Sequence, residues 1–312
     1  TPTYIQGGGR IEQNELIDYS SNRLVACIDL KNYSPSLPHL MVHRHDLILL
    51  LSERCRKAGV EIIFGEKLLS ITSSENPEFV TTKAQRKANL LVCADGINSI
   101  GRQFVTGGSE ASFTGHVAWR SVVPSNGAHP DTARIYMGPR KHAVSYPIRG
   151  GKLINLVLVE ERNCWVKESW SQKGDADVLR TIFASFNGDL PGLLAKVEET
   201  NIWGLFRHPV AKIWSKDDVV MLGDAAHPTL PFMAQGANLA LEDAWVLAQS
   251  FSVSESTSLG LLNYQAKRLH RVQRIVAEAN KNAWKYHLSF PPLRWAAQRA
   301  MSAAFSFAPR QM

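Results

Sequence analysis

The residues with the clearest chemical potential lie between positions 223 and 244. Gly223 and Asp224 follow an apolar segment at 218–222 that is typical of a buried strand. In an open α/β sheet, a carboxylate at the carboxyl end of a strand lies where ligands bind. A helical pattern then runs over 236–250, and the backbone N–H groups at a helix start favour negative charge. A plain turn or an ordinary helix cap explains each piece alone, but the whole run in order predicts a ligand site.

A second pair of chemically active residues lies in the middle of the chain. His142 and Tyr146 fall four positions apart in a segment of strand-like residues. Side chains four apart on a strand share one face, so both could point into one pocket. An imidazole can accept a proton near neutral pH, and a phenol hydroxyl can orient a ligand. The alternative is a half-buried strand with ordinary packing.

The surrounding segments predict an α/β chain with a β-rich insertion. Apolar residues at helical spacing indicate a helix over 46–58 that ends at Gly59, and a short strand follows at 60–64. The continuous apolar run at 90–94 is typical of a strand buried on both faces of a parallel sheet. Turn-separated strand segments between 112 and 160 predict an antiparallel sheet.

After this sheet the pattern returns to α/β structure. Residues 175–198 have helical character, and the strand at 218–222 follows. The sequence after the 236–250 helix is mostly helical. The expected order is therefore α/β, a mainly β insertion, α/β again, and then helices.

Composition fits a globular protein and narrows the class of partner. Of the 312 residues 45% are hydrophobic and 20% are charged, so the apolar content is too high for a disordered chain. The sequence has no membrane-spanning run and no signal-peptide pattern, so we expect a cytoplasmic protein without a membrane partner. The net charge of +7 favours anionic partners, but the basic residues are spread out, and we expect no nucleic-acid binding.

The sequence also predicts no metal site and no disulfide. Its four cysteines lie far apart and form no CxxC pair: Cys27, Cys55, Cys93 and Cys164. Such spacing favours reduced thiols in a cytoplasmic protein. The run His43–Asp46 contains metal-binding residue types, but adjacent residues at a helix start point in different directions.

Three motifs in order resemble those of the flavin-dependent aromatic hydroxylases, the family of p-hydroxybenzoate and salicylate hydroxylases. The second FAD-binding motif of that family is similar to the run Gly223-Asp224-Ala225-Ala226-His227-Pro228, which continues through Pro231 and Gly236-Ala237-Asn238 to Leu241-Glu242-Asp243-Ala244. Ala94–Ser99, with Arg102 behind it, resembles the Asp-Gly motif of the family, and Val42–Leu47 resembles its arginine at the head of a helix. The salicylate hydroxylase-like branch is the most similar.

This resemblance implies an α/β (α+β) fold of the p-hydroxybenzoate hydroxylase type, a three-layer FAD-binding fold with an inserted, mainly antiparallel substrate domain and C-terminal helices. It divides the chain into part of the FAD-binding domain (1–110), the substrate-binding sheet (111–215), and the return of the FAD-binding domain with the C-terminal helices (216–312). The strand–GxGxxG–helix unit that begins such enzymes has no counterpart in the printed sequence. We therefore expect a fragment, or a truncated relative, of such a hydroxylase.

The resemblance also implies that FAD is the cofactor. Arg44 would contact its pyrophosphate or ribose region, a role that suits a guanidinium group. Asp224 would accept hydrogen bonds from the ribitol hydroxyls. Asp95 would help to hold the cofactor region, and the alternative for Asp95 is capping of a helix near Ser99.

The start of the 236–250 helix is expected to face the flavin ring. The backbone of Gly236, Ala237 and Asn238 would lie at the pyrimidine edge, where a helix N-terminus stabilises the negative charge of reduced flavin. Pro231, in the preceding loop, is also expected to contact the cofactor. His227 is expected to be structural.

The implied activity is hydroxylation of a small aromatic acid or phenol with NADH or NADPH and O2, through a flavin C4a-hydroperoxide. His142 and Tyr146 resemble the substrate-contacting pair of the salicylate-type branch, with His142 accepting the phenolic proton and Tyr146 orienting the ring. The alternative function is that of a truncated, non-catalytic remnant that binds a partner or a small aromatic ligand.

Overall fold

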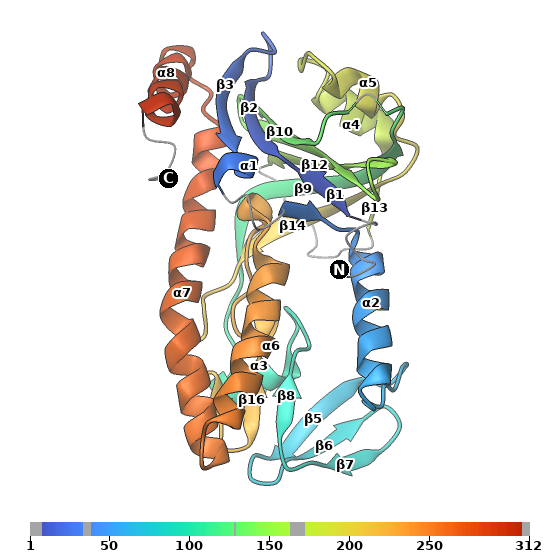
Figure 1. Cartoon of the computed structure of the whole chain (residues 1–312), viewed down its shortest axis with the longest axis vertical. Coiled ribbons are helices and arrows are strands. Elements are labelled where there is room, and N and C mark those ends of the chain that lie inside the picture. Colours follow the sequence, from blue (N-terminus) through green and yellow to red (C-terminus); the bar gives the residue numbers. More distant parts are fainter. Residues whose placement is uncertain (1–7, 34–38, 128, 163–171, 308–312) are drawn as a thin grey trace. The chain divides into compact units, whose positions relative to one another are not determined.

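The computed structural model describes residues 8–33, 39–127, 129–162 and 172–307. The chain forms two compact units (Figure 1): unit 1 contains residues 1–62, 115–205 and 284–312, and unit 2 contains 63–114 and 206–283. Cys164 lies outside the described residues, and the other three cysteines are free thiols. Within the described part of the chain, none of the helices has the length and apolarity that crossing a membrane requires.

Unit 1 is built on a sheet of eight strands in the order β13-β14-β9-β12-β11-β10-β2-β3. Their bounds are Gln13–Asp18 (β2), Leu24–Asp29 (β3), Ser112–Pro124 (β9), Thr132–Gly138 (β10), Lys141–Ile148 (β11), Leu153–Glu161 (β12), Lys173–Gly174 (β13) and Thr200–Arg207 (β14). Strands β9, β12, β11 and β10 pair antiparallel in succession, and β2 pairs parallel with β10. The antiparallel sheet predicted between 112 and 160 is therefore confirmed.

The C-terminal helix packs against one face of this sheet. Helix α8 (Pro291–Phe307) brings Met301 and Phe305 onto a cluster that contains Leu16 of β2 and Met137 of β10. Figure 1 shows α8 beside β3. Apolar burial of this kind is the main favourable term in folding, so the cluster ties the chain end to the sheet.

The opposite face of the sheet packs against two short helices, α4 (Ala176–Ile182) and α5 (Leu190–Leu194). The ammonium group of Lys141 lies over the ring of Phe183, which directly follows α4. Successive side chains on a strand point to opposite faces, so His142 lies on the face away from Lys141. The helical character predicted for 175–198 is confirmed, and the segment contains these two helices.

The first part of unit 1 also contains a small two-stranded sheet and an exposed helix. Strand β1 (Gly9–Ile11) pairs antiparallel with β4 (His39–Met41), and α1 (Leu30–Tyr33) lies between them in sequence. Helix α2 (Arg44–Lys57) confirms the predicted helix, and Gly59 after it has a φ of 78°.

The predicted strand at 60–64 is wrong, because this segment pairs with no strand in the described structure. Its side chains are largely exposed, with Phe64 exposed to 67%. A β-favouring composition reflects packing on a neighbouring strand more than an intrinsic backbone preference.

Unit 2 contains two three-stranded sheets and three helices. The sheets are β15-β16-β8, with bounds Ser215–Lys216, Val219–Met221 and Leu91–Cys93, and β5-β6-β7, with bounds Leu68–Ser73, Glu78–Thr81 and Gln85–Lys87. The helices are α3 (Ile100–Thr106), α6 (Gly236–Ser252) and α7 (Thr257–Tyr286). Trp214, Leu239, Tyr264 and Val272 are fully buried in the core between β16, α6 and α7.

The predicted strands at 90–94 and 218–222 both form, as β8 and β16, and they pair parallel. The expectation that the first is buried on both faces is wrong, since Val92 is 40% exposed. Its other face is closely packed, because a Cβ on Gly101 of α3 would lie 2.3 Å from Cβ of Cys93. One face of β8 is therefore core and the other is open in the described structure.

The predicted division into 1–110, 111–215 and 216–312 stays a prediction. Strands β2 and β3 belong to the eight-stranded sheet although they precede residue 110. The sheet therefore recruits the start of the chain as well as its middle.

Candidate functional site

The loop that carries Asp224 is shaped by a glycine. Strand β16 ends at Met221, and Gly223 follows with a φ of 62°. A Cβ on Gly223 would lie 3.0 Å from Cβ of Ala240 on α6, so the close approach of loop and helix requires glycine. Asp224 is exposed, and its Oδ1 lies 4.0 Å from the position that a Cβ on Gly236 would occupy. The predicted order of strand, Gly-Asp loop and helix is thus formed, with the carboxylate beside the start of α6.

A buried carboxylate holds this loop in place. Asp243 on α6 accepts hydrogen bonds from the backbone N–H of Gly223 at 3.0 Å, from Nε2 of His227 at 2.5 Å and from Nε of Arg268 at 2.7 Å. Burial acts to raise the pKa of Asp243, but these hydrogen bonds and the nearby charge outweigh it and lower the pKa. His227 is therefore held inside the unit, which fits the structural role expected for it.

A second buried charge holds the far side of the loop. Arg102 on α3 donates from Nη1 to the carbonyl oxygens of Ala225 at 3.2 Å and Ala226 at 3.0 Å, and from Nη2 to that of Pro209. Burial lowers the pKa of Arg102. The sequence shows an arginine behind the Asp-Gly motif, but only the structure shows that it fixes the Asp224 loop.

Asp95 caps helix α3. Its Oδ1 accepts from the Ser99 hydroxyl at 2.5 Å, and its Oδ2 accepts from the backbone N–H of Ile100 at 2.7 Å. Ser99 in turn accepts from the backbone N–H of Arg102 at 2.8 Å. The capping alternative is therefore present in the structure, and the cofactor role of Asp95 stays a prediction.

The start of α6 exposes backbone donors beside Asp224. Pro231 begins a short 3-10 helix, Pro231–Met233, which Ala234 ends in a left-handed conformation with a φ of 53°. Gln235 precedes the helix and makes no side-chain capping bond. The side chain of Asn238 donates to Oε1 of Gln235 at 3.3 Å, so the backbone N–H groups of Gly236 and Ala237 remain the polar surface at this end.

Arg44 lies in unit 1, as the first residue of α2, and is exposed. The same helix turn is anchored by Asp46, which accepts two hydrogen bonds from Arg149 at 2.8 Å each. This pairing lowers the pKa of Asp46. Arg44 and Asp224 belong to different units, so a shared role in cofactor binding stays a prediction.

Tyr146 lies in a polar row on one face of the eight-stranded sheet. It pairs across β11 and β12 with Asn155, which pairs with Val122 of β9. Asn155 is 3% exposed, and its Nδ2 has no hydrogen-bond partner in the described structure. Burial raises the pKa of Tyr146, and the guanidinium of Arg120 on the same face partly offsets this. Sequence analysis missed Asn155 and Arg120, because single polar residues on strands form no motif.

His142 shares this face but has different neighbours. Its Nδ1 shares a hydrogen bond of 2.6 Å with Nε2 of His287, which follows the end of α7. His287 donates from Nδ1 to Oε1 of Glu161 at 3.2 Å, and the ring centroid of His116 lies 5.1 Å from that of His287. Burial lowers the pKa of His142 well below 6.5 and that of His287 to about 4. Both imidazoles are thus neutral at pH 7.

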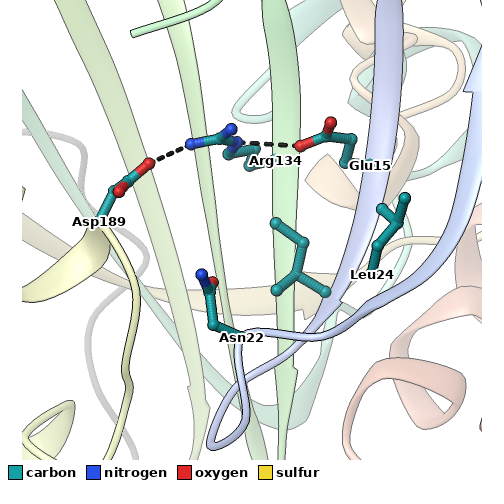
Figure 2. Close-up of a pocket in the computed structure, with 6 residues that line it drawn as sticks. Glu15, Asn22, Leu24, Arg134 and Asp189 are labelled. Atoms are coloured by element: carbon teal, nitrogen blue, oxygen red, sulfur yellow. Dashed lines mark hydrogen bonds and ion pairs between the residues drawn. The ribbon is translucent and has the colours of Figure 1, made fainter. Parts of the chain in front are cut away.

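The opposite face of the sheet has a small polar pocket of about 200 Å³. Figure 2 shows Arg134 between Glu15 and Asp189, which it contacts from Nε at 2.9 Å and from Nη1 respectively. Ile17, Asn22 and Leu24 complete the lining. Because both carboxylates pair with the single arginine, the arginine has no charge left for an anionic ligand.

Comparison with known proteins places these features in a family. A sequence model described as the FAD binding domain matches residues 11–279. The chain is 30% identical over 277 residues to 3-amino-4-hydroxybenzoate 2-monooxygenase PtnB3 of Streptomyces platensis, covering 86% of this chain and 68% of that protein. It is 33% identical over 263 residues to 3-hydroxybenzoate 6-hydroxylase of Polaromonas naphthalenivorans (strain CJ2), covering 80% of this chain and 64% of that protein. The chain thus spans about two thirds of these relatives.

Solved structures show the same fold. HpxO of Klebsiella pneumoniae, complexed with FAD and uric acid, superimposes with a TM-score of 0.82 at 23% identity, over 95% of this chain and 77% of that one. A salicylate hydroxylase substrate complex superimposes with a TM-score of 0.78 at 21% identity, over 100% and 81%. The predicted p-hydroxybenzoate hydroxylase-type fold is confirmed, and the chain belongs to the FAD-binding-domain family of FAD-dependent aromatic monooxygenases.

Proposed function

We propose that this chain acts in the FAD-dependent hydroxylation of a small aromatic acid or phenol, with NADH or NADPH and O2 as co-substrates. The observation that carries the proposal is the exposed Asp224 carboxylate beside the start of α6, on a loop fixed by buried Asp243 and Arg102. Such a loop suits a ligand, because buried charges hold its backbone in place while Asp224 and the helix start face outward.

The residues present fit the dinucleotide. Glycine at 236 leaves space for a group to approach both Asp224 and the backbone of α6. Asp224 accepts hydrogen bonds from the ribitol hydroxyls, and the N–H groups of Gly236 and Ala237 stabilise negative charge on the flavin. Arg44 binds the pyrophosphate or ribose region, and Pro231, Asn238 and Asp95 border the cofactor. Bound FAD supplies the activation of O2.

The aromatic substrate lies on the sheet face of Tyr146. Tyr146 orients the ring through its hydroxyl, the unpaired Nδ2 of Asn155 donates to a substrate oxygen, and Arg120 neutralises a carboxylate. His142, on the same face, is the proposed acceptor of the phenolic proton, although burial lowers its pKa and so weakens it as a base. Hydroxybenzoates and hydroxynicotinate, which relatives use according to their names, are substrates of this size and charge.

A product assay tests the proposal. The chain is incubated with FAD, O2, NADH or NADPH, and in turn 3-hydroxybenzoate, 3-amino-4-hydroxybenzoate and 6-hydroxynicotinate, and hydroxylated product is detected by mass spectrometry. The same assay is run on the chain extended by a strand–GxGxxG–helix unit of the family. We expect product from at least one substrate, and less product from Asp224→Ala when the FAD concentration is limiting. Aromatic binding without FAD binding in either form would support the non-catalytic alternative instead.

A further inference from the structure

Three imidazoles and a carboxylate meet at one end of the eight-stranded sheet. One ligand-type atom each from His116, Glu161 and His287 lies within 4.8 Å of the others. The fourth member, His142, is 3% exposed and lies 2.6 Å from His287. We call these four residues the histidine cluster. Sequence analysis predicted no metal site, and none of its motifs includes His116, Glu161 or His287.

The backbone holds the cluster rigidly. His116 and Glu161 face each other directly across β9 and β12, a position in which side chains are neighbours. The carbonyl oxygen of His287 accepts from the backbone N–H of Arg140 at 3.0 Å, and the backbone N–H of Glu161 donates to the carbonyl of Arg140 at 2.9 Å. The two strands and the segment after α7 are therefore tied together at this point, within unit 1.

We propose that His116, Glu161 and His287 bind a divalent first-row transition-metal ion, for which Zn²⁺ is the reference. Two imidazoles and one carboxylate are a donor set that such ions use, with water as a further ligand. Ions that prefer oxygen donors alone, such as Mg²⁺, are disfavoured by two nitrogen ligands.

The hydrogen bonds of His287 indicate which atoms of the cluster become the ligands of the ion. The proton on Nδ1 of His287 now points at Oε1 of Glu161, 3.2 Å away. The ion takes the place of this proton, so that Nδ1 and Oε1 become ligands. Both imidazoles stay neutral, because the proton of each moves from its Nδ1 to its Nε2 and none is released to solvent. Nε2 of His287 then carries the N–H and donates it to Nδ1 of His142, which becomes the partner that orients the ligand imidazole.

The remaining oxygen of Glu161 is also oriented. Oε2 accepts from Nε of Arg140 at 3.1 Å, while the Arg140 side chain is 57% exposed at the rim. The carboxylate of the neighbouring Glu160 accepts hydrogen bonds from Trp119 and Arg162. Glu161 is therefore the carboxylate that the cluster provides, held by an arginine that stays largely in water.

Zinc titration of the full 312-residue chain tests the site. The protein is stripped with EDTA, desalted, and titrated with Zn²⁺ and separately with Mg²⁺ by isothermal calorimetry, and Co²⁺ is added as an absorbance probe. We expect one Zn²⁺ bound with micromolar or higher affinity, no comparable Mg²⁺ binding, and a Co²⁺ spectrum of a site with nitrogen and oxygen ligands.

Glu161→Gln is the sharpest variant, because glutamine keeps the shape of the side chain and one accepting oxygen but carries no charge. Its Zn²⁺ affinity should fall by about 100-fold or more, and His287→Gln should behave alike. His270→Gln removes an exposed histidine of α7 and should leave Zn²⁺ binding unchanged.

Two outcomes would overturn the proposal. One is wild-type Zn²⁺ binding no tighter than millimolar, and the other is Zn²⁺ binding that survives Glu161→Gln and His287→Gln. Loss of binding in a His43→Gln/His45→Gln variant, with the cluster variants unaffected, would move the site to the start of α2. Circular dichroism of each variant without metal checks that it is folded.

Discussion

The two units hold their candidate sites in different ways. In unit 2, the loop of Asp224 is fixed by buried charges that are fully engaged, and Asp243 alone accepts three hydrogen bonds. In unit 1, the sheet face around Tyr146 is lined by uncharged groups and one arginine, and Nδ2 of Asn155 has no partner among the described residues.

Because of this difference, ligand binding gains free energy in different ways at the two sites. A loop whose backbone is already held by buried charges is preorganised, so a ligand that binds it does not have to order it. A buried donor without a partner costs about 1–3 kcal/mol, and a ligand that accepts from it recovers this free energy. The Asp224 loop thus presents one carboxylate in a fixed position. At the Tyr146 face, a bound aromatic ligand recovers the free energy that the unpaired donor costs.

The largest effect should come from removing the buried charge of unit 2. Asp243→Ala removes the acceptor of Nε of Arg268 and of Nε2 of His227, and both side chains are buried, so we expect the free energy of unfolding to fall by about 3–5 kcal/mol. Glu53→Gln, whose carboxylate lies in an exposed pair with Lys57, should cost far less. Urea unfolding measures both, and equal losses would mean that the loop is not held by the buried charge.

Asp224→Ala should change ligand binding rather than folding. Loss of a charge-assisted hydrogen bond costs about 1.5–3 kcal/mol, so FAD affinity should fall about tenfold to a hundredfold. Quenching of flavin fluorescence measures the affinity. Asp177→Ala removes a carboxylate that is 88% exposed and serves as the charge-matched control. An unchanged affinity in Asp224→Ala would remove the loop from the cofactor site.

The Asp224 loop was predictable because its parts are contiguous in sequence. An apolar strand, Gly-Asp and a glycine-led helix follow one another, and each has its own local signal. The support from Asp243 and Arg102 was not predictable, since their partners are backbone atoms that become neighbours only after folding.

The candidate site on the sheet face of Tyr146, in contrast, could not be predicted from the spacing of residues in the sequence. The register of β11 and β12 pairs Tyr146 with Asn155, and no rule of spacing along one strand contains that pairing. His116 and His287 are brought together by β9 and the segment after α7, so the histidine cluster also depends on tertiary structure. The strand predicted at 60–64 failed for a related reason, because composition alone supplies no partner strand.

A milder effect is expected on the substrate side. Tyr146→Phe and Asn155→Ala each remove one hydrogen-bonding group, so binding of a hydroxybenzoate should weaken by up to about tenfold, with FAD affinity unchanged. Equilibrium dialysis with the aromatic acid measures this. Ser145→Ala, on the same strand but the opposite face, should not weaken binding. A loss as large in Ser145→Ala would show that the strand, and not its Tyr146 face, was disturbed.

A further prediction concerns the pH dependence of stability in unit 1. Asp18, at the end of β2, accepts from Ser20, Ser21 and Gln298, and these hydrogen bonds overcome the effect of burial and lower its pKa to about 2. A carboxyl whose folded pKa is below its unfolded value of about 3.9 stabilises the fold above that value. This stability is lost as the pH falls from about 4 to about 2. Asp18→Asn should therefore lower the stability of the fold at pH 6 and flatten the dependence of stability on pH in this window, measured as Tm.

Because Gln298 belongs to α8, the loss of stability should appear first as release of that helix, seen as faster hydrogen exchange there. Equal pH dependence in wild type and Asp18→Asn would show that the acid sensitivity arises elsewhere, for example at Glu242, whose pKa is also lowered to about 2 by Arg271 and Arg268.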